Sequence, residues 1–382
     1  MAREFRTSPD FKTAVLANGS AGTSGQVLTS AGAGAAPSWT TISGGGGGLS
    51  QFVESEDTAS PNATVPVDAL TATDATYANI DVAFVAKGTG ATLAQVPTGT
   101  TAGGNKRGAG AVDWQKNRTA ASHVASAQYG TIGGGSENTV SSNYSFVGGG
   151  QGNIAQSNTH AAVCGGNSNT ASGQHAFVGS GLSNTASGAR SSIAGGDSNI
   201  ASGVYATVCG GWSNTSDGNS SFVSGKLSTA RGIESNFVLG GSALPNLGNS
   251  QSGNLVLGVQ TTGASATVLT SNQSAASTSN QCILPNNSAY SFSGEVIAGV
   301  TGGGNTARWT ISGAIKRGAT AASTAMVGTP TVTMTHNDAG AATWTVAVTA
   351  DTTNGGIAVT VTGAAATTIR WVCRINTTEM SF

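Results

Sequence analysis

Histidine is a frequent metal ligand, and two of the four histidines of this chain lie at equivalent places of a repeated pattern. His160 and His175 are fifteen residues apart, which is the length of one repeat, so their side chains would project from adjacent units. The same column also contains Tyr129, Tyr144, Arg190 and Tyr205. A variable outward-facing column accounts for these residues more simply than metal ligation, and we predict no metal site.

Paired carboxylates could hydrolyse glycosidic bonds, and glycine-rich loops could bind nucleotides. The acidic candidates are Glu54, Glu56, Glu137, Glu234 and Glu295, and no regular spacing relates them. The glycine-rich stretch at residues 148–152 is not followed by the Lys-Ser/Thr pair of a phosphate-binding loop. We therefore predict no catalytic residues, no cofactor and no enzymatic activity.

The elements that would position these side chains form a repeat over residues 126–242. One apolar residue recurs in each unit: Ile132, Val147, Val163, Val178, Ile193, Val208, Val223 and Val238. Glycine follows two and three residues later in most units, and asparagine follows six residues later in six successive units. A fixed short period over eight units predicts a solenoid.

Each unit has room for two short strands and two turns. In the segment 205–208, alternation predicts that Ala206 and Val208 point inward while Tyr205 and Thr207 point outward. A coil then buries about one valine and one alanine, which is little apolar surface for its length. Such a thin core favours association with other chains.

Glycine and asparagine both tolerate positive φ, so we assign the glycine and asparagine columns to the corners of the coil. We expect Gly165, Gly195 and Gly210 to have backbone conformations that other residues resist.

Two of the units resemble a known family. Residues 187–201, Ser-Gly-Ala-Arg-Ser-Ser-Ile-Ala-Gly-Gly-Asp-Ser-Asn-Ile-Ala, and the following unit at residues 202–215 are similar to the head repeats of YadA-type trimeric adhesins. The repeat covers about a third of the chain. The resemblance implies a parallel β-roll, three chains side by side, and a role in attachment.

The composition excludes several classes of partner. The formal net charge is −1 and only 9% of the residues are charged, which gives no electrostatic basis for binding nucleic acid or an acidic membrane. No apolar run reaches the roughly 18 residues of a transmembrane helix, and the N-terminus lacks the apolar core of a signal peptide. We predict neither a nucleic-acid partner nor membrane insertion.

The N-terminal segment carries a second resemblance. Residues 17–39 are similar to a stretch near the N-terminus of phage tail fibres, in which this part docks to the particle. The resemblance implies that residues 1–48 anchor the chain to a tail or capsid structural protein, with Phe5, Phe11 and Trp39 as candidate anchor residues. A flexible glycine-, serine- and alanine-rich linker is the alternative interpretation.

The segments between the anchor and the C-terminus are assigned from their strand patterns. Residues 49–103 contain short strand-like runs, one of them at 92–96, and are predicted to form a small β domain. Residues 104–242 form the shaft, and its atypical first coils at 104–125 cap the solenoid. Residues 243–283 are a transition with strands at 254–258 and 266–270.

Period two replaces period fifteen over residues 284–382. Alternating apolar residues around Trp309, Trp344 and Trp371 are separated by turn sequences, which predicts an antiparallel, jelly-roll-like β-sandwich with the three tryptophans in its core. Residues 368–376, near the end of this segment, resemble the closing strands of phage fibre tip domains.

The four cysteines are assigned no disulfide. Cys164 and Cys209 occupy the same repeat position three coils apart, roughly 14 Å, which is too far for a bridge. We interpret both as small apolar residues, and we expect free buried thiols at Cys282 and Cys373, whose pairing the sequence leaves open.

Taken together, the resemblances imply an all-β virion fibre: a homotrimeric parallel β-roll shaft followed by a C-terminal antiparallel β-sandwich tip that binds a host-surface glycan or protein. Loops on a rigid scaffold commonly carry binding residues. The candidate receptor-binding residues are Asn305, His336, Asn337, Asp338, Asn354 and, on the shaft, Trp212. A tail fibre is our first interpretation, a head fibre or capsid decoration of the same build is the second, and a glycan-degrading tailspike is the enzymatic alternative.

Overall fold

The computed structural model of the chain describes residues 23, 26–29, 35–41, 52–57, 67–72, 86–157, 159–241, 244 and 246–382. The chain divides into two compact units, Met1–Phe84 and Val85–Phe382. The described residues contain no α-helix, only the short 3-10 helices η1 (Ala321–Ser323) and η2 (Ala339–Ala341). The expected all-β class is therefore confirmed.

The described part of the first unit consists of two antiparallel hairpins. Strand β1 (Gln26–Thr29) pairs with β2 (Ser38–Thr41), and Leu28 lies opposite Trp39. Strand β3 (Phe52–Asp57) pairs with β4 (Val67–Ala72). The first hairpin lies within residues 1–48, the segment assigned to the particle anchor. Of the candidate anchor residues, Trp39 lies on β2, whereas Phe5 and Phe11 lie outside the described residues.

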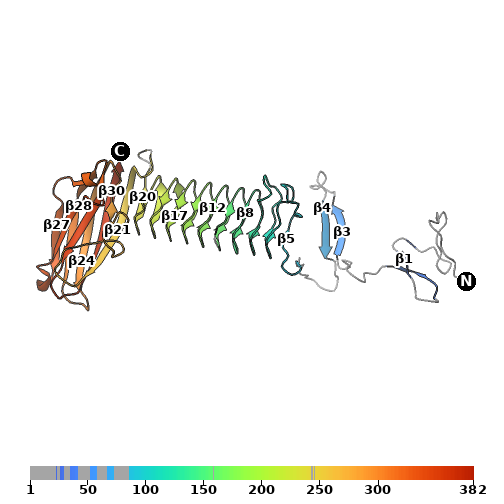
Figure 1. Ribbon diagram of the computed structural model, residues 1–382, viewed down its shortest axis with the longest axis horizontal. Coiled ribbons are helices and arrows are strands. Elements are labelled where there is room, and N and C mark those ends of the chain that lie inside the picture. Colours follow the sequence, from blue (N-terminus) through green and yellow to red (C-terminus); the bar gives the residue numbers. More distant parts are fainter. Residues whose placement is uncertain are drawn as a thin grey trace. The chain divides into compact units, whose positions relative to one another are not determined.

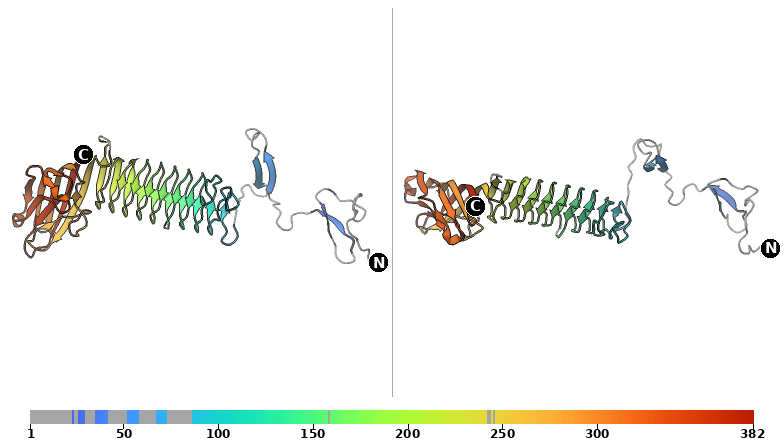
Figure 2. Two further views of the ribbon diagram at one scale, coloured as in Figure 1. Left: turned by 45° about the horizontal axis from the view of Figure 1, so that its top comes forward. Right: turned by 90° about the horizontal axis from the view of Figure 1, so that it is seen from above.

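The second unit begins with a stack of coils that confirms the predicted solenoid (Figures 1 and 2). The first sheet of the stack contains eight successive parallel rungs: β7 (Thr131–Ile132), β9 (Phe146–Val147), β11 (Ala162–Val163), β13 (Phe177–Val178), β15 (Ser192–Ile193), β17 (Thr207–Trp212), β19 (Phe222–Lys226) and β20 (Phe237–Gly240). The second sheet is 6-stranded and contains β8 (Thr139–Val140), β10 (Ile154–Ala155), β12 (Thr170–Ala171), β14 (Thr185–Ala186), β16 (Ile200–Ala201) and β18 (Thr215–Ser216).

The core of the stack is thin, but each coil buries one small residue more than the sequence predicts, because the second sheet adds one to the pair in the first, as with Ala161, Val163 and Ala171. The first sheet contributes one valine or isoleucine per coil and the second sheet one small residue, as with the fully buried pair Ile193 and Ala201. Where the chain enters β17, Ala206 and Val208 are buried and Tyr205 is exposed, which confirms the predicted alternation.

The two cysteines of the shaft are free and lie outside its core. Cys164 and Cys209 each follow an inward-pointing valine, and because successive side chains of a strand alternate, both thiols face outward and are exposed. Cys282 and Cys373 are buried and free, as expected.

The stack starts earlier along the chain than the sequence indicated. Strand β5 (Thr92–Leu93) lies in the segment assigned to a small β domain, yet it pairs in parallel with β6 (Val112–Asp113), which pairs with β7. Backbone hydrogen bonds hold it there: the Thr92 N–H donates to the Ala111 carbonyl at 2.9 Å.

Beyond the last coil the first sheet continues without a break into antiparallel strands (Figure 1). Strand β20 pairs with β21 (Ser250–Thr261), and β21 pairs over its full length with β30 (Ile369–Ser381). The sheet then adds β24 (Ser288–Val300) and β25 (Thr306–Arg317), with β26 (Ala325–Met326) and β27 (Thr331–Asn337) on the far side of β25. A shared backbone ladder therefore joins the shaft to the C-terminal strands.

A second, 4-stranded sheet is built around β29 (Gly356–Thr362). Strand β28 (Thr345–Asp351) pairs along one edge, while β22 (Thr267–Val268) and β23 (Cys282–Ile283) share the other. The three predicted core tryptophans are buried, and the Trp371 ring lies 5.6 Å from that of Trp309 and 5.8 Å from that of Trp344. One apolar cluster contains residues of both sheets.

Candidate functional site

Four of the candidate receptor-binding residues are brought together at one end of β25. Residue Asn305 precedes β25, and the β25–β27 register places His336 opposite Arg308 and Asn337 opposite Ala307. The Thr306 N–H donates to Asp338 Oδ2 at 2.8 Å, and the Asp338 N–H donates back to the Thr306 carbonyl at 2.9 Å. Asp338 therefore fixes the loop, and the Asn337 side-chain amide also donates to the Asp338 carbonyl at 3.0 Å. The side chains of Asn305, His336 and Asn337 are exposed.

The fifth candidate, Asn354, lies apart from this loop cluster. It belongs to the β28–β29 turn, whose Gly355 carbonyl accepts a 3.4 Å hydrogen bond from Arg317 at the opposite end of β25. The Asn354 side chain and backbone N–H groups both donate to Asp351. Burial opposes ionisation of Asp351, but the hydrogen bonds from Asn354 and the Thr353 N–H outweigh it and hold the pKa of that carboxyl below its ordinary value.

The sixth candidate, Trp212, lies on the outside of the shaft. Parallel bridges run along its column through Ser136, Gln151, Asn167, Leu182 and Asp197, as the repeat alignment predicts. Its side chain is 43% exposed, and the Lys226 ammonium lies 4.9 Å from the centre of its ring. The structure thus separates the six candidates into the loop cluster, the Asn354 turn and the shaft.

The asparagine column was assigned wrongly, because it forms a buried ladder instead of corners. Asn138, Asn153, Asn169, Asn184, Asn199 and Asn214 are all fully buried, and none has a positive φ. The Asn184 side-chain amide donates to Asn169 Oδ1 one coil earlier and to the carbonyls of Ser180 and Gly196, at 3.0, 3.1 and 2.9 Å. An amide is well suited to this place because it offers two donors and one acceptor.

Within the repeat, the residues with positive φ lie in other columns. Serines such as Ser183 and Ser198, and the corner column of Tyr129, Tyr144, His160, His175, Arg190 and Tyr205, all adopt it without being glycine. The glycines that adopt it include Gly166, Gly181, Gly196 and Gly211. Gly165 and Gly195, which we expected to need special conformations, have no positive φ, whereas Gly210 has a φ of 142°. A Cβ atom at Gly165 would meet nothing within 4 Å, and one at Gly195 would make only ordinary contacts with Ser180.

The aromatic residues of the corner column stack on one another. The ring centres of Tyr144 and His160 are 5.3 Å apart, and those of His160 and His175 are 4.9 Å apart with nearly parallel planes. An imidazole nitrogen directs its lone pair within the plane of its own ring, so two nearly parallel stacked rings do not direct theirs at one metal ion. Within the described ranges, no three His, Cys, Asp or Glu side chains gather closely enough to hold a metal ion.

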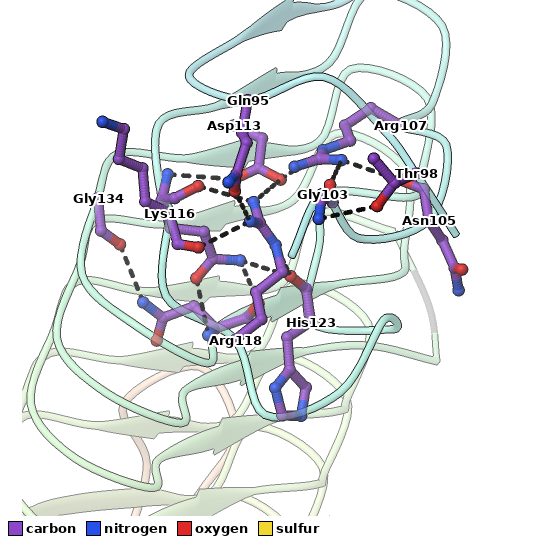
Figure 3. Close-up of polar contacts among 12 residues, drawn as sticks. Gln95, Thr98, Gly103, Asn105, Arg107, Asp113, Lys116, Arg118, His123 and Gly134 are labelled. Carbon is purple, nitrogen blue, oxygen red and sulfur yellow. Dashed lines mark hydrogen bonds and ion pairs between the residues drawn. The ribbon is translucent and has the colours of Figure 1, made fainter. Parts of the chain in front are cut away.

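The first coils end the ladder with a buried charged network (Figure 3). Asp113 stands opposite Ile132 in the core column, and its carboxylate accepts hydrogen bonds from Arg107 at 2.7 Å and Arg118 at 3.4 Å. Burial, together with the nearby Arg107 charge, lowers the pKa of Arg118 despite the attraction of Asp113. Gln115 continues the ladder by exchanging two hydrogen bonds with the backbone of Asn138.

A matching network closes the last coil. The Gln251 side chain of β21 exchanges two hydrogen bonds of 3.0 Å with the backbone of Thr229, and it also donates to Glu379 at 2.8 Å. Glu379 forms an ion pair with Arg231. Burial opposes the charged form of Arg231, but Tyr290 and Glu379 outweigh it and raise its pKa, while burial followed by Glu379 raises the pKa of Tyr290.

A hollow of about 650 Å³ lies where the last coil meets the C-terminal strands. Its lining comes from both parts: Thr229, Arg231, Gly232, Leu247, Thr278, Ser279, Ile283, Leu284, Pro285, Arg317, Ala321, Thr353, Asn354 and Ser381. We call this hollow the junction cleft. Its residues are scattered through the sequence, so no local motif could have revealed it.

Comparison with known proteins gives no family. A search of family models finds no match to this chain, and a search of curated proteins finds none either. No helix in the described part of the chain is long and apolar enough to cross a lipid bilayer.

Proposed function

We propose that this chain is a subunit of a phage tail fibre: its N-terminal segment docks to the particle, its coil stack forms the shaft, and its C-terminal strands attach to the host surface. The observation that carries the proposal is the ladder between β20 and β21, through which a regular solenoid passes directly into a compact antiparallel unit. We interpret the two C-terminal sheets as a jelly-roll-like sandwich tip. The resemblances at residues 17–39 and 187–215 provide the biological setting.

The shaft is proposed to be a parallel homotrimer. A core of one large and two small residues per coil leaves aromatic side chains outside, and Phe146, Phe177 and Phe237 of the first sheet are each about 40% exposed. Burying these rings against neighbouring chains would supply apolar contact that a single coil lacks. Light scattering of the full chain should return three times 37.3 kDa, and a stable particle of 37.3 kDa would disprove the trimer.

Attachment by the C-terminal unit is tested by competition. The purified full-length protein, added to host cells before the phage that encodes it, should reduce phage adsorption, and a Trp212→Ala variant should compete equally well. Failure of the parent protein to compete would contradict attachment. If the parent competes and the Trp212→Ala variant does not, recognition belongs to the shaft instead of the tip.

A further inference from the structure

The junction cleft combines two guanidinium groups with a lining that contains no carboxylate. Arg231 and Arg317 both line it, and every other lining side chain is uncharged. Arg231 is neutralised by its ion pair with Glu379, whereas Arg317 has no acidic partner among the described residues. The cleft therefore keeps one uncompensated positive charge.

Arg317 is held in place and left with unused donors. Its Nη1 donates to the Leu284 carbonyl at 2.6 Å, while its buried Nε has no hydrogen-bond partner in the described part of the chain. The guanidinium occupies the space that a side chain at Gly355 would need, and Gly355 has a φ of 82°. A fixed planar fork with free donors suits a carboxylate or a phosphate better than it suits a neutral group.

The remainder of the lining suits a sugar ring. Thr278, Ser279 and Asn354 provide hydroxyl and amide groups, and Leu247 and Pro285 provide apolar surface. Small-ligand sites commonly combine a few polar groups with apolar walls, in volumes of roughly 300–1,000 Å³. The 650 Å³ of this cleft falls within that range.

We infer that the junction cleft binds an acidic saccharide, with the Arg317 guanidinium on the acidic group and the hydroxyl-bearing lining on the ring. This inference rests on the proposed attachment function and names the class of surface sugar that it would recognise. It also places recognition at the Asn354 side of the C-terminal unit, at the opposite end of β25 from the loop cluster.

Ligand-observed saturation-transfer NMR on the full-length protein tests the inference. The probes are glucuronate, galacturonate and N-acetylneuraminate, with glucose as the neutral match and inorganic phosphate as the anion without a ring. We expect transfer to at least one sugar acid, little to glucose, and displacement of the sugar acid by phosphate only at much higher concentration. Transfer to none of the acids, equal transfer to glucose, or equal affinity for phosphate would overturn the inference.

Variants separate binding from a structural role of Arg317. Arg317→Gln and Arg317→Lys should weaken sugar-acid binding roughly tenfold, because a point charge does not replace the fork. Lys316→Gln removes the same charge from the neighbouring exposed position and should bind like the parent. Thr278→Trp should block the cleft without touching the guanidinium. Unchanged sugar-acid binding in both Arg317→Gln and Thr278→Trp would overturn the site. If the parent protein still blocks phage adsorption in that case, the proposed attachment function stands and only the junction cleft is excluded as the binding site.

Discussion

The Asn184 side-chain amide donates a 3.0 Å hydrogen bond to Asn169 Oδ1, and both side chains are fully buried. The same contact joins Asn169 to Asn153, Asn199 to Asn184 and Asn214 to Asn199. A backbone bond accompanies it over a longer range: each backbone N–H donates to a side-chain oxygen one coil earlier, from Asn138 on Gln115 to Ser228 on Asn214. Each asparagine also binds two backbone carbonyls, so the ladder satisfies polar groups that the turns bury. The ladder therefore stabilises the coils from inside, together with the buried column of valine and isoleucine residues.

Replacing one rung of this ladder should destabilise the shaft. Asn184→Ala leaves the Ser180 carbonyl without its side-chain donor and the buried Asn199 N–H without its acceptor, and an unsatisfied buried polar group costs about 1–3 kcal/mol. Thr185→Ala alters the adjacent, partly exposed side chain and serves as the control. Thermal unfolding should show a clear loss for the first variant only, and equal melting temperatures would contradict the ladder's role.

Two adjacent glycines, Gly165 and Gly166, allow a direct test of the corner geometry. A Cβ atom at Gly166, where φ is 90°, would overlap the Gly181 carbonyl oxygen of the next coil, whereas one at Gly165 meets nothing within 4 Å. We expect Gly166→Ala to cost at least about 1–3 kcal/mol, and Gly165→Ala to stay within about 0.5 kcal/mol of the parent. Denaturant titration measures both, and a reversed order would refute the assigned corner geometry.

The asparagine and glycine columns show which features of the fold could be predicted from the sequence and which could not. The period, the inward valines and the alternation at Tyr205–Val208 follow from spacing alone, and all were correctly predicted. Spacing could not tell a buried asparagine from a corner asparagine, since both recur once per coil. Positive φ at Ser183 and His175 was missed because these residues seldom adopt it, and here inter-coil backbone hydrogen bonds stabilise it, as from the His175 N–H to Thr159.

The candidate site was harder to predict for a different reason. Asn305, His336 and Asn337 meet because β25 and β27 pair, and turn signals on either side of those strands were enough to select them. The junction cleft combines residues as distant as Thr229 and Ser381, and only the pairing of β21 with β30 brings them close. Arg317 gave no local signal, since its role depends on the space left by Gly355.

Thiol reactivity should divide the four cysteines into two pairs. Burial raises the pKa of Cys373 to about 12 and also raises that of Cys282, so both thiols stay protonated and protected. Cys164 and Cys209 are exposed and should react with iodoacetamide in the native protein. Mass spectrometry should count two modified residues in native protein and four after unfolding. Rapid native modification of Cys373 would contradict its burial.

Asp351 should make stability fall in acid. Its folded-state pKa lies below the ordinary value of 3.8, so its contribution is present above that value and is lost as pH falls through the folded pKa. Asp351→Asn should lower the melting temperature near neutral pH and reduce its decline below about pH 4. Melting curves between about pH 7 and about pH 3 compare the two proteins, and parallel declines would show that Asp351 does not contribute.

Locating the two ends of the chain on the phage particle tests the fibre account most directly. The last residue, Phe382, is 78% exposed, so a short tag added after it should be accessible to gold-labelled antibody. The account predicts gold at the distal ends of tail fibres, with full-length protein on the particles and none when residues 1–48 are deleted. Label on capsid fibres would move the attachment from tail to head. Particles without label, or gold at the particle-proximal ends of the fibres, would contradict the account.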